Sequence, residues 1–93
     1  MRTVHQPTAI KAILDMVLEQ EAYKVQGSVW GASRTARLIS EAFDRFSYLH
    51  DALVEGDLEW ADSIWDGILE ILERALKKGY EVELDTIKLI SRM

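Results

Sequence analysis

Hydrophobic residues recur every three or four positions along three long stretches of this 93-residue sequence, which is the spacing of amphipathic helices. The first stretch begins at Pro7 or Thr8 and extends to about Val25, the second extends from Ser33 to Glu55, and the third covers residues 57–78. The pattern therefore predicts an all-α fold, a small helical bundle of three main helices plus a short C-terminal helix.

The third stretch has the clearest boundaries and the sharpest division into two faces. Asp57 is suited to the N-cap, and Gly79 to the left-handed position after the helix. At 100° per residue one half of the helix is apolar and consists of Ala61, Ile64, Trp65, Ile68, Ile71, Leu72, Ala75 and Leu76. The opposite face contains the acids Glu59, Asp62, Asp66, Glu70 and Glu73. We expect one continuous helix, apolar towards its neighbours and anionic towards the outside.

Glycine and serine residues mark the predicted breaks between the helices. Two glycines and two serines in residues 26–33 end the first helix, and Trp30 is expected to anchor this loop on the core. Ser33 is a good N-cap for the second helix, and Gly56 ends it. The turn at Gly56 is so short that the second and third helices should form an antiparallel hairpin.

The end of the chain allows two interpretations. Residues 80–84 alternate apolar and acidic side chains, which is typical of a strand, and a lone strand would have to pair with a second copy of the chain. Alternatively, Asp85 is an N-cap that follows a short extended piece, with Ile87 and Ile90 facing inward. We prefer the extended piece followed by a terminal helix.

Composition narrows the class of protein. The length predicts a single domain over residues 1–93, and the absence of cysteine excludes disulfides and thiolate zinc sites. No apolar run is long enough to span a bilayer, and the first residues do not resemble a signal peptide, so we expect a cytoplasmic protein without membrane contact. The net charge of −5 is concentrated after residue 55. Because this negative charge repels nucleic acid, we do not expect direct binding to it.

A search for catalytic chemistry yields little. The sequence has two histidines, of which His50 is expected at the edge of the core, and we predict no enzyme activity, no metal site and no cofactor. The segment from Arg45 to His50 resembles the Arg-x4-His pattern of HEPN ribonuclease domains, although Phe46 stands where that family has a polar residue. The resemblance implies His50 as the acid–base group and Arg45 as a phosphate clamp at a dimer cleft.

Binding of another protein is the function that the pattern favours. The acids Glu59, Asp62, Asp66 and Glu70 would contact a basic partner surface, while Trp60 and Tyr48 would be the buried anchors of an adaptor or inhibitor that acts by occlusion. Accessory proteins of phages and plasmids offer an analogy.

Two alternatives remain open beside the HEPN-like one. A helix-turn-helix-like regulator is favoured by the arginines and hydroxyls of residues 33–37, and a homodimer by Tyr48, Trp60 and residues 80–84. Within the third helix, ion pairs are expected for Glu70 with Arg74 and for Glu73 with Lys77, and Gly67 leaves a notch beside Trp60.

Overall fold

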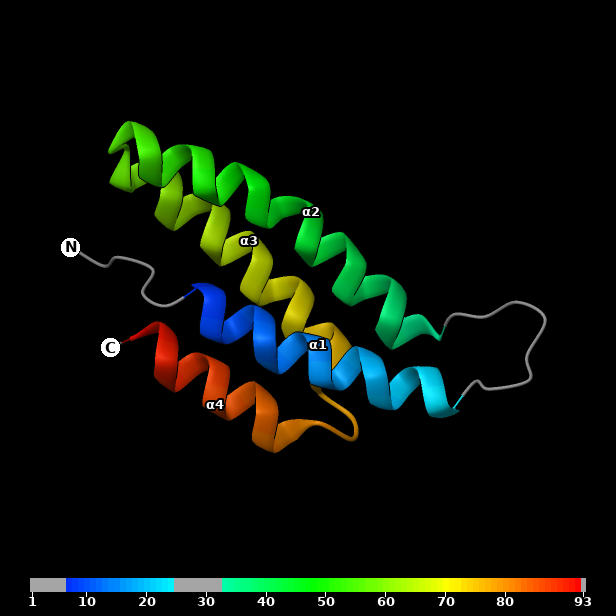
Figure 1. Cartoon of the computed structure of the whole chain (residues 1–93). Helices are drawn as coiled ribbons and strands as arrows, with labels where there is room; N and C mark the ends of the chain where they lie inside the picture. Colours follow the sequence, from blue (N-terminus) through cyan, green and yellow to red (C-terminus); the bar gives the residue numbers. More distant parts are fainter. Residues whose placement is uncertain (1–6, 25–32, 93) are drawn as a thin grey trace.

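Four α-helices account for nearly all of the chain that a computed structural model describes, namely residues 7–24 and 33–92 (Figure 1). They are α1 (Pro7–Lys24), α2 (Arg34–Glu55), α3 (Leu58–Leu76) and α4 (Glu81–Ser91). The described residues contain no strand, which confirms the all-α class. The expected loop anchor Trp30 lies outside the described residues.

The helix ends lie where the capping residues predict them. Ser33 Oγ accepts a hydrogen bond from the Ala36 amide at 3.1 Å, and Asp57 Oδ1 accepts one from the Trp60 amide at 3.0 Å. Gly56 (φ 77°) and Gly79 (φ 98°) adopt the left-handed conformation, which costs glycine little and other residues more. The predicted bounds of the first three helices are therefore confirmed to within about two residues.

The helices form two layers of antiparallel neighbours. α2 and α3 pack along their whole length as the predicted hairpin, and α1 and α4 lie beside each other against it (Figure 1). α1 contacts α2, and α3 contacts α4, so each helix has two neighbours.

The core between the helices consists largely of aliphatic side chains from all four of them. Among the larger fully buried side chains are Trp65, Ile10, Leu14, Ile39, Leu49, Ile68, Leu72, Leu76 and Ile87. Trp65 is the largest of these, and its ring packs at a tilt against Phe46, with 6.4 Å between the ring centroids.

The prediction for the end of the chain is partly wrong. α4 begins at Glu81, so residues 81–84 are helical and Asp85 lies inside the helix instead of capping it. Tyr80, Leu84 and Ile87 are buried, whereas Val82 is 74% exposed, so the spacing that matters is three to four residues and not two. The carboxylate of Glu81 caps the turn by accepting a hydrogen bond from the Gly79 amide at 3.2 Å.

Candidate functional site

A groove between the outer sides of α2 and α3 contains both predicted aromatic anchors. Asp44, Arg45 and Tyr48 of α2 and Trp60 and Ile64 of α3 line it, and its volume is about 450 Å³. Tyr48 is 57% exposed and Trp60 is 39% exposed, so both rings are accessible to a ligand. The structure thus brings together two residues that lie twelve positions apart in the sequence, because the turn at Gly56 folds α3 back along α2.

The charge inside this groove comes from α2. The guanidinium group of Arg45 is 3.4 Å from the carboxylate of Glu41, one turn earlier, so its charge is partly neutralised. Asp44 forms no ion pair with another described residue. The groove therefore offers two aromatic rings and the Asp44 carboxylate, which suit a cationic side chain, beside the paired guanidinium group of Arg45.

None of the five acids of α3 lines the groove. Glu59 and Asp66 are exposed, whereas Asp62 is half-buried and its Oδ1 has no hydrogen-bond partner among the described residues. Asp62 lies about 160° around the helix from Trp60, since two residues correspond to 200°. Asp62 therefore faces away from the groove, whereas the exposed acids Glu59, Asp66 and Glu70 lie about 80–120° around the helix from Trp60.

Ion pairs neutralise the second half of the acidic face. Glu70 pairs with Arg74 at 3.2 Å, as predicted. Glu73 pairs at 3.2 Å with Lys88 of α4 and not with Lys77, because α4 packs against this side of α3. The negative charge that remains for a partner is thus strongest near the start of α3, close to Trp60.

The space beside Gly67, where the sequence predicts a notch on α3, is not filled by any described residue. A Cβ atom built on Gly67 meets no atom within 4 Å, and the helix continues through this position without a break. The close approach of another backbone that would explain this glycine is therefore not made by the described residues of the same chain.

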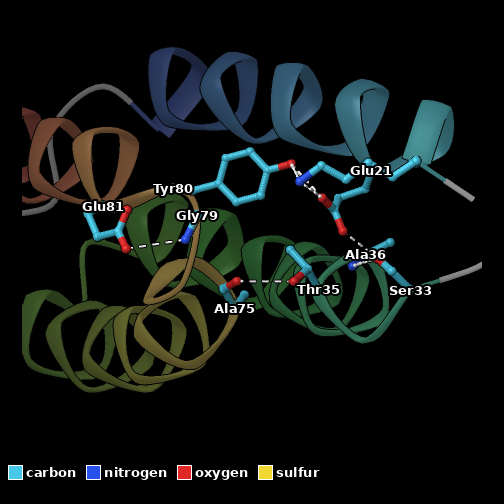
Figure 2. A network of polar contacts seen from close by, with 9 residues as sticks. Glu21, Ser33, Thr35, Ala36, Ala75, Gly79, Tyr80 and Glu81 are labelled. Atoms are coloured by element: carbon cyan, nitrogen blue, oxygen red, sulfur yellow. Dashed lines mark hydrogen bonds and ion pairs between the residues drawn. The ribbon is translucent and has the colours of Figure 1, made fainter.

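Sequence reasoning missed a buried polar cluster at the end of α1. Glu21 is 5% exposed, and its carboxylate accepts hydrogen bonds from the hydroxyl groups of Ser33, at 2.8 Å, and Tyr80 (Figure 2). The ammonium group of Lys24 lies 2.9 Å from the same carboxylate and donates to the Tyr80 hydroxyl at 3.1 Å. This cluster joins α1 to the starts of α2 and α4.

The electrostatics of the cluster favour a charged Glu21. Burial raises the pKa of this carboxyl, but the hydrogen bonds from Tyr80, Lys24 and Ser33 outweigh burial and leave the pKa below its ordinary value. Burial, together with the hydrogen bond to Glu21, raises the pKa of Tyr80. A signal was present in the sequence, because Glu21 continues the buried spacing of Ile10, Leu14 and Val17.

The residues of the HEPN-like pattern are not brought together within one chain. Arg45 lies in the groove with Trp60, whereas His50 lines a different cavity of about 120 Å³ beside Pro7 and Lys11. His50 is exposed, so its expected place at the core edge is wrong. The physical reason is that α1 starts at Pro7, and only its first turn lies next to His50.

The hydroxyl groups of the helix-turn-helix-like segment are engaged inside the chain. Ser33 caps α2 and donates to Glu21, and Thr35 donates to the carbonyl of Ala75 in α3 at 3.3 Å (Figure 2). These contacts fix the start of α2 against α1 and α3.

Among the residues that the structure describes, no three histidine, aspartate or glutamate side chains gather into a group that could hold a metal ion. No helix in the described ranges is both long and apolar enough to cross a membrane. No protein-family model, curated protein or solved structure matches this chain.

Proposed function

We propose that this chain is a small acidic protein-binding module of the cytoplasm, an adaptor or inhibitor that acts as one helical-bundle domain. Its docking surface would be the groove between α2 and α3 together with the adjacent acidic side of α3. The observation that supports this most is the meeting of Tyr48 and Trp60, both exposed, in one groove of about 450 Å³. Tyrosine and tryptophan are the residue types enriched at the energetic centres of protein interfaces.

The chemistry of the groove points to a basic partner. Asp44 lies with the two rings, and Glu59 and Asp66 are exposed on the neighbouring side of α3. An arginine or lysine of the partner would place its cation over the rings and against Asp44. The acids around the groove would raise the association rate, and salt would lower it. The module would then act by covering the basic surface to which it binds.

The test requires a captured partner and two double-alanine variants, one in the groove and one outside it. After affinity capture from the source cell, the dissociation constant for the partner is measured by calorimetry for wild type and for Tyr48→Ala/Trp60→Ala. Loss of two anchors should weaken binding by at least about 2 kcal/mol, or about 30-fold. The control is Tyr23→Ala/Leu89→Ala, which removes two exposed apolar side chains from α1 and α4 and should leave the constant unchanged.

Two results would contradict the proposal. One is equal affinity of wild type and the Tyr48→Ala/Trp60→Ala variant. The other is binding that stays constant between low and high salt, which would exclude the acidic residues Asp62, Asp66 and Glu70 from the interface. A homodimer through the same groove is tested separately by sedimentation, where a single 10.7 kDa species at high concentration would exclude it.

A further inference from the structure

A second pocket lies at the other end of the α2–α3 hairpin, where α2 begins and α3 ends. Its volume is about 320 Å³. Four of its six lining residues are cationic, and the six are Arg34, Thr35, Arg74, Ala75, Lys77 and Lys78. The hydrogen bond from Thr35 to the Ala75 carbonyl ties the two helix ends together at this place (Figure 2). A concentration of positive charge is unexpected in a chain of net charge −5.

Most of this positive charge is not neutralised within the protein. Arg74 pairs with Glu70 at 3.2 Å. Arg34, Lys77 and Lys78 form no ion pair with any other described residue, although acids outnumber bases by sixteen to eleven in the sequence. Like charges held close together repel each other, and an anion between them would remove that repulsion.

The backbone at the pocket contributes one positive and one negative helix end. The 22-residue helix α2 begins here, and its first turn supplies the positive end of the helix dipole and amide groups without partners inside the helix. The lysines after α3 offset the negative end of that helix. The two helix ends thus act in opposite directions, and the attraction for an anion comes from the cationic side chains, in a cavity that has walls on two helices.

We propose that this pocket binds a soluble phosphate ester or diphosphate, through Arg34, Lys77 and Lys78 with Arg74 at its edge. Its volume lies at the lower end of the range for small-molecule sites, which suits a compact anion. The overall negative charge repels polyanionic surfaces such as nucleic acid or acidic membranes, and a small anion is repelled far less. The pocket is separate from the groove at Tyr48 and Trp60, so this proposal is independent of the docking function.

The experiment is a titration of the full chain with inorganic pyrophosphate in low-salt buffer, followed by amide NMR. Saturable shifts should appear at residues 34–37 and 74–79 and not around Tyr48 and Trp60. In Arg34→Gln/Lys78→Gln the dissociation constant should rise by at least about tenfold, because charge-assisted hydrogen bonds are lost. The control Lys11→Gln/Arg92→Gln makes the same change in net charge with two exposed cations that do not line the pocket, and should bind like wild type.

Three results would overturn the proposal. They are no saturation by about 10 mM pyrophosphate, equal weakening in both double variants, and binding only to a single-stranded oligonucleotide or to phosphatidic acid vesicles. Melting curves of the variants are compared first. If Arg34→Gln/Lys78→Gln is less stable than wild type, Lys77→Gln/Lys78→Gln replaces it, because both lysines are exposed and lie after the end of α3.

Discussion

Replacing Glu21 by alanine should destabilise the protein more than the loss of an exposed surface glutamate would. Glu21 is 5% exposed, and its carboxylate accepts hydrogen bonds from Ser33 and Tyr80, each of which is a bond to a charged group. Such bonds contribute about 1.5 kcal/mol each at the lower end of their range, which gives about 3 kcal/mol for the two. The ion pair with Lys24 is left out of this sum, because that side chain is 60% exposed and solvent screens it.

For a domain of this size, a loss of about 3 kcal/mol lowers the melting temperature by about 12–24 °C. The measurement is urea or thermal unfolding followed by circular dichroism at pH 7. Glu19→Ala is the matched control, because Glu19 is exposed on the same helix and its loss should change the free energy of unfolding by less than about 0.5 kcal/mol.

A double-mutant cycle with Tyr80 separates the contact from general damage to α1. Tyr80→Phe removes only the hydroxyl group that donates to Glu21 and should cost about 1.5 kcal/mol. Since both variants break the same hydrogen bond, the double variant Glu21→Ala/Tyr80→Phe should be more stable than the sum predicts by about 1.5 kcal/mol. Additivity within about 0.5 kcal/mol would show that the two groups do not interact, and would refute this account of the cluster.

Four further predictions concern the pH dependence of the Glu21 contribution and three other positions. The stability contributed by Glu21 should be fully present above the pKa of a glutamate in the unfolded chain, about 4.3. It should be lost as the pH falls through the lower pKa that Glu21 has in the folded protein. A free energy of unfolding that does not change below about pH 5 would contradict this. Gly67→Ala should raise the free energy of unfolding by about 1 kcal/mol, because the new methyl group meets no atom within 4 Å. Asp57→Ala should cost about 1 kcal/mol through loss of the cap on the Trp60 amide. Leu72→Ala should cost about 2–5 kcal/mol in the same unfolding assay, since its side chain is fully buried.

The local features of the fold could be predicted because each rests on neighbouring residues. Ser33, Gly56, Asp57 and Gly79 determine their helix ends through hydrogen bonds or backbone angles that involve a few adjacent positions. The apolar face of residues 57–78 likewise needs only the helical period.

Prediction from the local residue pattern fails at Tyr80 and the residues after it. Alternation over residues 80–84 is typical of a strand, but the buried contact between Tyr80 and Glu21, 59 positions away, favours the helix. Tertiary contacts of this kind override a five-residue pattern.

The candidate site was predictable in its residues and not in its arrangement. Tyr48 and Trp60 were expected as anchors, and the structure places them in one groove, which depends on the length of the turn at Gly56 and the register of the hairpin. Asp44 was not singled out, since it lies on a polar face like many other acids. Which acids remain unpaired depends on α4, because Lys88 reaches Glu73 only in the folded chain.

Gly67 connects the stability of α3 to its proposed use. A glycine in the middle of a helix costs about 1 kcal/mol relative to alanine, and no contact within the described residues compensates for it. Gly67 lies one turn after Ile64 and about two turns after Trp60, so it extends the surface of the groove. If a partner helix approaches closely at this notch, Gly67→Ala should stabilise the free protein and weaken its binding to the partner. A variant that gains stability and keeps full affinity would remove Gly67 from the docking surface and leave Tyr48 and Trp60 as its centre.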